Sequence, residues 1–234
     1  QKTLILGGKQ MKYEIRGGNL PVVLVDINAG ESLFTQSGGM AWMTNNISMS
    51  TNMEGGLFGG LARAFSGESI FMATYTCQNG SGTIAFASTF PGTILPIQFD
   101  GTKTLICQKD AFLAAERSVN LEVIFRRKLG AGLFGGEGFI MQKISGNGTA
   151  FLELDGDIVE YTLQPGQVLK VDTGHVAAFD STVAFEIETV KGFKNILFGG
   201  EGLFLTKLTG PGKVWLQTMP IQNVAKRILP FLPH

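Results

Sequence analysis

The sequence has few of the side chains that carry most enzyme chemistry. It contains two histidines and two cysteines among 234 residues, and only 16% of its residues are charged, against about 25% in an average globular protein. A metal centre needs several histidine, cysteine or carboxylate ligands that converge on one ion. A Ser-His-Asp triad would depend on His175 alone. We therefore expect no metal, no cofactor and no enzymatic activity.

The sequence has no excess of charge of either sign. Lysine plus arginine and aspartate plus glutamate are balanced at 19 residues each, which leaves a net charge of zero. The densest basic run is the three residues 126–128, whereas a surface that binds a phosphate backbone usually carries clustered positive charge. We therefore expect no DNA partner, and we do not expect RNA.

Long apolar runs and cysteine pairs are also missing. No run approaches the ~18–20 apolar residues that span a bilayer, and no secretory leader is recognisable. Cys77 and Cys107 lie in apolar segments, which is typical of buried thiols in a reducing compartment rather than of a disulfide. These features predict a cytoplasmic location.

Glycine, in contrast, is abundant, with 32 residues, and much of it belongs to a repeated segment. Leu-Phe-Gly-Gly-Glu-Gly occurs at 133–138 and 197–202, and a shorter copy occurs at 57–60. The repeat-defining residues are Leu57, Phe58, Gly59, Gly60, Leu133, Phe134, Gly135, Gly136, Glu137, Gly138, Leu197, Phe198, Gly199, Gly200, Glu201 and Gly202. Such a repeat indicates similar units that bury their apolar surfaces against their neighbours.

Each copy is followed by an apolar strand-like segment, a Gly-x-Gly sequence and a second strand-like segment. The Gly-x-Gly sequences lie at 80–82, 146–148 and 210–212. Because glycine permits the positive φ of a tight turn, each stretch predicts a β-hairpin. The string Gly-x-Gly-x-x-Gly at 130–135 precedes a strand pattern rather than the helix that dinucleotide binding requires, so it predicts no nucleotide site.

A second element alternates with these stretches. Residues 28–33 match residues 164–169, and a middle copy begins near residue 100. The sequence therefore predicts an all-β fold of three tandem, similar β-domains. Their predicted boundaries are 11–90, 91–156 and 157–219.

A different division would begin each domain at the predicted hairpin. In that case residues 203–208 would pair with residues 21–27 rather than with residues 157–163, to complete the third domain. The consecutive division is favoured because closing distant chain ends costs conformational entropy.

The two ends of the chain lie outside the repeat. Residues 1–10 are interpreted as an extension or an expression remnant, and residues 220–234 as a helical tail. The helix is predicted over 221–229 and ends before Pro230. Its apolar residues would share one side: Ile221, Val224, Ala225, Ile228 and Leu229. We expect this side to dock on the protein body, with a membrane-surface or partner anchor as the alternative.

Residues 11–23, the two Leu-Phe-Gly-Gly-Glu-Gly motifs and residues 227–233 resemble a mainly prokaryotic family of uncharacterised proteins. That family is related to the mitochondrial biogenesis protein called altered inheritance of mitochondria protein 24. The resemblance covers residues 11–233. It implies three domains, each a short double-stranded β-helix like a subunit of the tryptophan RNA-binding attenuation protein (TRAP). It also implies a ring in which three chains of three domains mimic a ring of nine. It supplies no functional residues, because the family has no established activity.

The leading hypothesis is a non-enzymatic scaffold or interaction protein that forms a ring-like homo-oligomer, with a trimer expected. The first alternative is a ring module that binds a small ligand or RNA, either at a cleft between domains or at the methionine-rich residues 40–53. The second alternative is a peripheral membrane partner that attaches through the tail.

Overall fold

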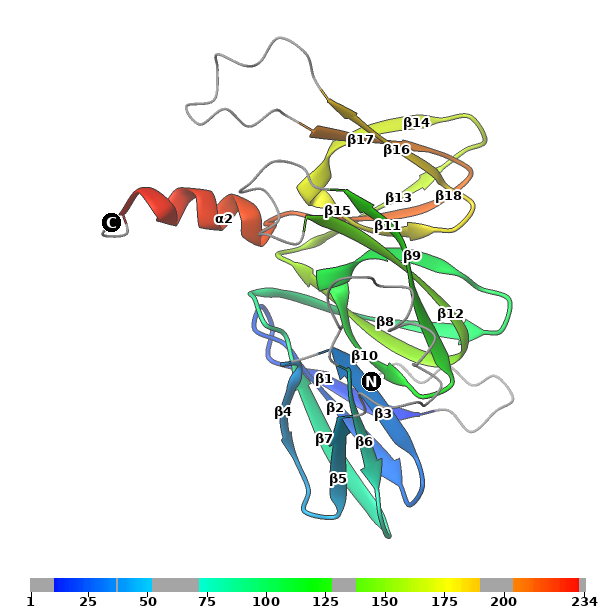
Figure 1. The fold of residues 1–234 in the computed structure, drawn as a ribbon, viewed down its shortest axis with the longest axis vertical. Helices are drawn as coiled ribbons and strands as arrows, with labels where there is room; N and C mark the ends of the chain where they lie inside the picture. The colour runs from blue at the N-terminus through cyan, green and yellow to red at the C-terminus, as the bar shows by residue number, and fades with distance from the viewer. Residues whose placement is uncertain (1–10, 37, 52–71, 128–137, 190–203, 232–234) are drawn as a thin grey trace. The chain divides into compact units, whose positions relative to one another are not determined.

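A computed structural model describes residues 11–36, 38–51, 72–127, 138–189 and 204–231 of the chain. In these ranges nearly all regular structure is β-strand, with one short α-helix near the C-terminus (Figure 1). The prediction of an all-β fold with a C-terminal helix is therefore confirmed. Two compact units divide the chain. The first consists of Gln1–Gly101, Phe112–Asn120 and Gly146–Glu153, and the second of Thr102–Ala111, Leu121–Ser145 and Leu154–His234.

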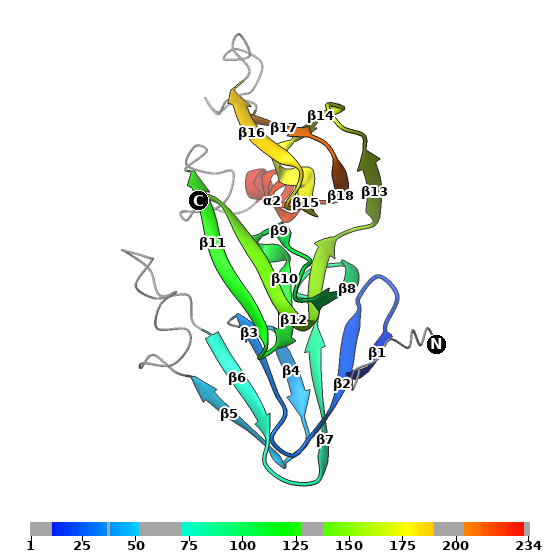
Figure 2. The ribbon, with the colours of Figure 1, turned by 90° about the vertical axis from the view of Figure 1, so that its right-hand side faces the viewer.

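The first unit is built on antiparallel sheets (Figure 2). One sheet has the order β1-β2-β7-β4, and β5-β6-β3 continues through β10 to the last part of β12. The strands are β1 (Lys12–Arg16), β2 (Val22–Asn28), β3 (Ser32–Gln36), β4 (Met40–Met43), β5 (Ile47–Thr51), β6 (Met72–Cys77), β7 (Ser81–Ala87), β8 (Gly92–Asp100) and β10 (Phe112–Glu116).

The second unit repeats this arrangement. One sheet runs β13-β18-β15-β9 to the first part of β12, and another has the order β14-β17-β16. The strands are β9 (Leu105–Gln108), β11 (Val119–Arg127), β12 (Phe139–Asp155), β13 (Ile158–Leu163), β14 (Val168–Asp172), β15 (Val176–Asp180), β16 (Ala184–Thr189), β17 (Phe204–Thr209) and β18 (Gly212–Gln217). The helix α2 (Ile221–Ile228) follows, and short 3₁₀ turns lie at Lys109–Ala111, Thr173–His175 and Leu229–Phe231.

The pairing in the two units follows one pattern. β2-β7-β4 and β3-β6-β5 in the first unit correspond to β13-β18-β15 and β14-β17-β16 in the second. In the third set of strands, the long strand β12 stands where the other two sets have two separate central strands. Its first part pairs with β9, and its last part pairs with β10. This recurrence supports the predicted threefold repeat. The boundaries 11–90, 91–156 and 157–219 stay a prediction.

The predicted hairpins are wrong. β6 pairs with β3 and β5, whereas β7 pairs with β2 and β4. Likewise, β17 and β18 belong to different sheets, and β12 continues through residues 146–148 without a break. A strand-glycine-strand pattern looks the same whether the chain turns back or passes into another sheet, and here it passes into another sheet.

The two pairings considered for residues 203–208 are also wrong. β17, which contains most of these residues, pairs with β14 and β16. The strand that pairs with β13 is instead β18, in the antiparallel register Ile158 opposite Gln217 through Leu163 opposite Gly212. The third set of strands is therefore complete without the N-terminal strands.

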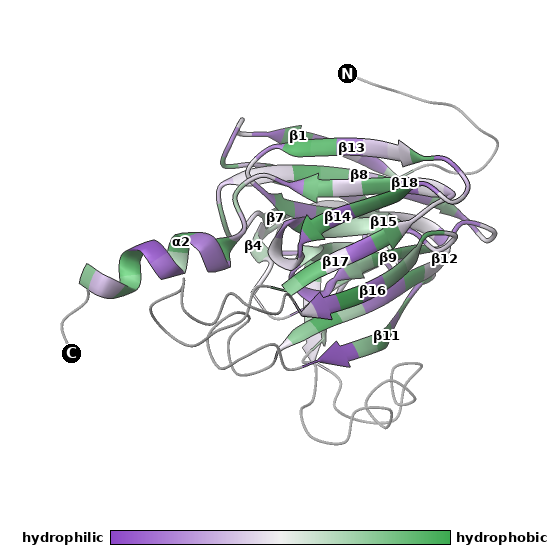
Figure 3. Cartoon of the chain, turned by 90° about the horizontal axis from the view of Figure 1, so that it is seen from above, coloured by the Kyte–Doolittle hydropathy of each residue, from purple (hydrophilic) through white to green (hydrophobic). Residues whose placement is uncertain are grey.

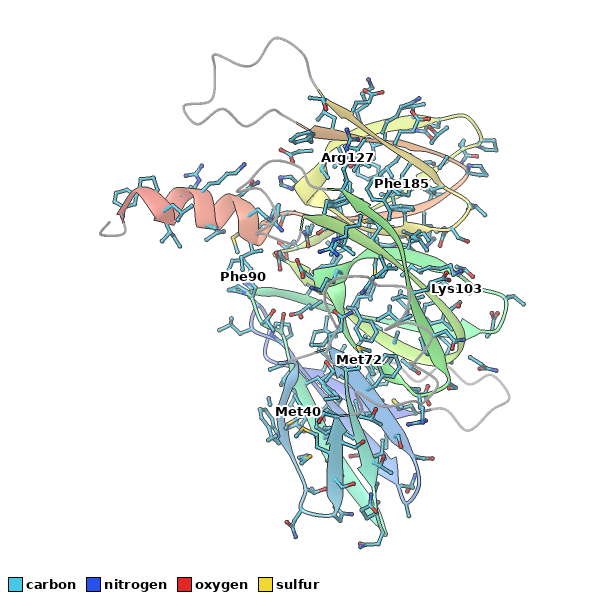
Figure 4. All side chains as sticks on the ribbon, in the orientation of Figure 1. Met40, Met72, Phe90, Lys103, Arg127 and Phe185 are labelled. Carbon is cyan, nitrogen blue, oxygen red and sulfur yellow. The ribbon has the colours of Figure 1, made fainter. Side chains whose placement is uncertain are left out.

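Each unit has its own apolar core, which follows from alternation along the strands. In β2, for example, buried Val23, Val25 and Ile27 alternate with partly exposed residues, and burying such a side chain contributes about 1.5–3 kcal/mol. In the second core Phe185 packs against Phe125 and Phe179 at ring-centroid distances of 5.2 and 5.4 Å (Figure 4).

Candidate functional site

The Gly-x-Gly segments form one recurring hydrogen bond. In each copy the residue after the second glycine donates its backbone N–H to a side-chain oxygen. The residue that carries this oxygen is the last residue of a strand, or the one directly after it, in the same unit. The bonds join Thr83 to Thr44 Oγ1 (3.2 Å), Thr149 to Glu116 Oε2, and Lys213 to Asp180 Oδ2 (2.8 Å). Because the bond recurs at all three Gly-x-Gly segments, it belongs to the repeated architecture.

The second glycine of each segment leaves room for this hydrogen bond. A Cβ atom on Gly82 would lie 2.6 Å from Thr44 Oγ1, and one on Gly148 would lie 2.7 Å from Glu116 Oε2. At Gly212 the nearest atom would be Thr182 Oγ1, also at 2.7 Å. These contacts are shorter than van der Waals distance, so the glycines in these segments serve structure rather than ligand binding.

Sequence reasoning missed Thr44, Glu116 and Asp180. They share an acceptor oxygen but not a residue type, so they do not stand out in a search for identical residues. One signal was present, because Glu116 and Asp180 each precede their hydrogen-bond partner by 33 residues.

The clearest irregularity in the repeat is the exposure of β4. We call β4, β10 and β15 the third strands, and β3, β9 and β14 the second strands, after their order in the repeat. The first four residues of both β10 and β15 are buried, whereas none of the four residues of β4 is buried. Trp42 is 53% exposed, and Met40 lies on the same strand (Figure 4). Met40 and Met43 pack partly against the first core, so among the described residues this third strand presents Trp42 without cover.

β14 differs from the other second strands in the same way. All four residues of β9 are buried, and so are the three central residues of β3. In β14 only Val171 is buried, and Val168 is 47% exposed.

Strand pairing explains both contrasts. β10 pairs with the second strand β3 as well as with β12, and β15 pairs with the second strand β9 as well as with β18. Within the described residues, β4 pairs only with β7, and β14 pairs only with β17. Among the residues that the structure describes, one third strand and one second strand therefore keep a free edge.

The first unit also contains an open pocket of about 640 Å³. Its lining is mostly polar. The charged residues are Lys12, Asp26, Glu31, Glu116 and Arg117, and the hydroxyl residues are Ser32, Thr44, Ser81, Thr83 and Ser118. Hydrogen bonding by Thr83 and Lys12 lowers the pKa of Asp26 below its ordinary value, so Asp26 is ionised at neutral pH and forms an ion pair with Lys12 at 3.1 Å.

The residues considered for catalysis are held in structural contacts. His175 Nδ1 lies 2.8 Å from the Gln217 carbonyl oxygen, and Nε2 lies 3.3 Å from Asn223 Nδ2. Cys77 and Cys107 are both free and buried, and burial raises the pKa of the Cys107 thiol far above its ordinary value. In the described ranges no three histidine, cysteine, aspartate or glutamate side chains are placed to hold a metal ion.

The tail helix α2 forms at the predicted place, but no residue in it is buried. Hydrophobic and hydrophilic residues alternate along it (Figure 3), and Ile221 and Ile228 are 44% and 50% exposed. The expectation that the apolar side of α2 docks on the body is therefore wrong for the described residues. In them, hydrogen bonds attach only the start of α2 to the body. Among the helices the structure describes, none is long and apolar enough to cross a membrane.

Most of the repeat-defining motif lies outside the described residues. Gly138, with a φ of +82°, is the one member inside them. The remaining members lie outside the described ranges: Leu57, Phe58, Gly59, Gly60, Leu133, Phe134, Gly135, Gly136, Glu137, Leu197, Phe198, Gly199, Gly200, Glu201 and Gly202.

Comparison with known proteins identifies the family. The sequence profile of the mitochondrial biogenesis AIM24 family matches residues 13–219, which run from the second residue of β1 to beyond the end of β18. The chain belongs to the AIM24 family. This membership confirms the resemblance given by the glycine motifs.

AIM24-family relatives of this chain occur in Streptococcus pyogenes. An uncharacterised protein of the serotype M6 strain is 31% identical over 234 residues, which cover 96% of this chain and 92% of that protein. The crystal structure of another S. pyogenes protein, a structural genomics target, is similar with a TM-score of 0.77 and 28% identity. That match covers 95% of this chain and all of the other chain.

Proposed function

We propose that this AIM24-family protein is a non-enzymatic scaffold or interaction protein that assembles with copies of itself into a ring-like homo-oligomer, with a trimer expected. The observation that carries the proposal is the exposed third strand. β10 and β15 are buried and paired on both sides, whereas the apolar strand β4 is paired on one side and exposed.

The physical argument concerns the free edge. A strand edge offers unpaired N–H and C=O groups, and proteins often protect such an edge with charged side chains or proline. β4 carries Met40, Ala41, Trp42 and Met43 instead. Adding a strand there would satisfy the backbone groups and cover the exposed Trp42, as in β-augmentation.

The state of the reactive side chains supports the non-enzymatic part of the proposal. Both ring nitrogens of His175 face hydrogen-bond partners, and the raised pKa of Cys107 keeps that thiol protonated and a poor nucleophile. The two free, buried cysteines also support the expected cytoplasmic location.

Light scattering coupled to size exclusion tests the proposal. At micromolar concentration we expect a mass that is a multiple of the 25.1 kDa chain. Trp42→Ser should lower the oligomer mass or its persistence on dilution. Ile124→Ser is the matched control, because Ile124 is 41% exposed on β11, whose counterparts β5 and β16 also lie at sheet edges. A wild-type monomer throughout the concentration range would contradict the proposal.

A second candidate function is small-ligand binding, and the pocket in the first unit favours it. Its hydroxyl and carboxylate lining suits a small polar ligand that donates hydrogen bonds. Native mass spectrometry of protein purified from cells should then show retained mass, which Thr83→Val and Arg117→Ala should reduce. The same mass under native and denaturing conditions would contradict ligand retention.

The exposed apolar side of α2 favours attachment to a membrane surface as a third candidate. Lys226 and Arg227 on its other side would lie near acidic lipid headgroups. Vesicles that contain phosphatidylserine should then bind the full chain, and Ile228→Asp should abolish that binding. Equal sedimentation of both proteins with the vesicles would eliminate this role.

A further inference from the structure

The free edges of β4 and β14 are complementary to each other. Twice in the described residues a second strand pairs with the third strand of the following set, namely β3 with β10 and β9 with β15. β14 is the second strand without a third-strand partner, and β4 is the third strand without a second-strand partner. The described part of the repeat therefore contains one unused edge of each kind.

The position of each third-strand residue can be assigned from its neighbour in the sheet. Trp42, Ala114 and Ala178 lie opposite Ala85, Phe151 and Trp215, respectively. The register also shifts just before this position in each strand: between Met40 and Trp42, between Phe112 and Ala114, and between Val176 and Ala178. A shared bulge at one place shows that the three strands present their edges in the same way.

The second strands can be aligned by the same method. Thr35, Cys107 and Val171 lie opposite Ala73, Gln142 and Thr206 on the neighbouring strands. In the two existing pairings Ala114 lies opposite Thr35, and Ala178 lies opposite Cys107. Both known pairs thus join the same third-strand position to the same second-strand position.

From this correspondence we propose that β14 of one copy adds to β4 of the next copy as an antiparallel strand, which rests on the self-assembly proposed above. The register is Trp42 opposite Val171, Met43 opposite Lys170, and Thr44 opposite Leu169. A backbone ladder forms along an edge that is otherwise apolar, and the exposed Trp42 is covered.

Other sheet edges do not fit this role. β5, β11 and β16 occupy matching places in the repeat, and each lies at an edge of its sheet among the described residues. An edge that is free in every copy indicates a surface of the finished assembly. β2 also differs from its counterparts β8 and β13, because it pairs with β1 as well as with β7. Among the second and third strands of the described residues, only β4 and β14 lack a pairing that their counterparts have, so the missing contact is assigned to them.

This pairing has a direction. Each copy contributes β4 to one neighbour and β14 to the other, so the interface is heterologous and the copies join head to tail. Such an interface either closes into a ring or extends as a fibre. Ring closure agrees with the homo-oligomer proposed above.

Disulfide cross-linking between two variants tests the register. Met43→Cys and Lys170→Cys are purified separately, mixed to allow exchange of copies, and oxidised. Directly opposed residues of antiparallel strands have Cα atoms about 4.5–5.5 Å apart, which a disulfide can bridge. We expect a reducible dimer of twice the 25.1 kDa chain mass in the mixture and in neither variant alone. Native Cys77 and Cys107 are buried, and the wild-type chain oxidised in the same way measures any background cross-linking through them.

Three controls separate the possible outcomes. Met43→Cys mixed with Asp172→Cys places the second thiol two residues further along β14 and should cross-link several-fold less. Cross-linking of Met43→Cys with itself would overturn the head-to-tail direction, and stronger linkage to Asp172→Cys would overturn the register. An internal disulfide in a monomeric Met43→Cys/Lys170→Cys double variant would show that the two edges close within one chain.

The failure of the register and the failure of self-assembly give different results. An oligomer by mass that yields no cross-link in the mixture overturns the β4–β14 contact and leaves the scaffold proposal standing. A wild-type monomer by mass contradicts both.

Discussion

Single glycines in this protein differ in what a side chain would meet. Gly146 and Gly101 both have a positive φ, of +105° and +88°. A Cβ on Gly146 would lie 2.5 Å from the Ser118 backbone oxygen, whereas a Cβ on Gly101 would have no atom within 4 Å. The first glycine is therefore required by both conformation and space, and the second by conformation alone.

This difference predicts the cost of two alanine substitutions. Gly101→Ala should lower the free energy of unfolding by about 1–2 kcal/mol, the cost of a left-handed conformation for a residue with a Cβ. Gly146→Ala should cost roughly 1–3 kcal/mol more, because the backbone must also move to relieve the overlap. Urea denaturation of both variants measures the difference, and equal midpoints would contradict it.

Glu153 is a buried carboxylate that the sequence did not single out. It is 8% exposed, and its Oε2 atom accepts hydrogen bonds from the Ser88 hydroxyl at 3.0 Å, the Thr89 N–H at 2.7 Å and the Thr89 hydroxyl at 3.0 Å. An isolated glutamate in a strand pattern looks like a surface residue, because its partners are 64 and 65 residues away in the chain.

Truncating this buried carboxylate should leave the donors of half-buried Ser88 and exposed Thr89 without their acceptor. We expect Glu153→Ala to lower the free energy of unfolding by about 2–4 kcal/mol, and Glu153→Gln to lower it less, because the amide oxygen can still accept. Thermal unfolding followed by circular dichroism is the measurement. A change below about 0.5 kcal/mol in the alanine variant would show that the three bonds contribute nothing.

At the scale of strands and helices, edges and anchors decide what an element can do. β4 has apolar side chains and a free edge, while β14 carries Lys170 at the position assigned to face Met43. α2 is attached at its start, where Asp155 Oδ2 accepts the Ile221 N–H at 2.8 Å and Asn223 contacts His175. In the described residues, the exposed residues of β4 and the apolar side of α2 are not covered by other parts of the protein.

A charge exchange tests the assignment of Met43 to Lys170. Met43→Lys places two like charges opposite each other, and we expect a weaker assembly by about 0.2–1 kcal/mol at each interface. Met43→Glu, which faces Lys170 with the opposite charge and leaves the ion pair of Lys170 with Glu188 in place, should assemble more tightly than Met43→Lys. Dilution series by mass photometry give the dissociation constants. Equal dissociation constants for Met43→Glu and Met43→Lys would place Met43 and Lys170 apart.

The anchor of α2 predicts a dependence on pH. Burial, and to a smaller degree the charge of Asp110, raises the pKa of Asp155, although the Ile221 N–H opposes this shift. A raised pKa in the folded state means that the folded protein binds more protons, so stability is lost as pH rises from the ordinary value of 3.8 through the raised one. Asp155→Asn, which keeps an acceptor oxygen, should therefore unfold at higher urea than the wild type at pH 7.

The matched measurement for this variant is made at low pH. Below the ordinary aspartate pKa both side chains are neutral, so the gain should shrink as the pH is lowered to 4 and below. A gain of equal size at pH 4 and pH 7 would show that the effect does not come from ionisation of Asp155.

At the scale of the whole molecule, some features could be predicted from the sequence because they depend on local pattern. The repeated strand-like segments on each side of a glycine sequence gave the all-β class, the spacing of Ile221, Val224 and Ile228 gave α2, and the glycine motifs gave the family. The recurring strand order in the two units supports the repeat that the same motifs predict.

The pairing of strands could not be predicted in the same way. The residues around a Gly-x-Gly segment do not determine whether the chain turns back or crosses to another sheet, because both paths need the same positive φ at Gly80 or Gly212. Distant contacts decide the outcome, such as the hydrogen bond from Lys213 to Asp180, 33 residues away. The free edge of β4 likewise becomes visible only beside β10 and β15, where the same edge is paired.

Native mass spectrometry of the wild-type chain at micromolar concentration tests self-assembly most directly. The account predicts a discrete closed oligomer, with a trimer at three times 25.1 kDa as the expected species. A single species at 25.1 kDa would contradict it.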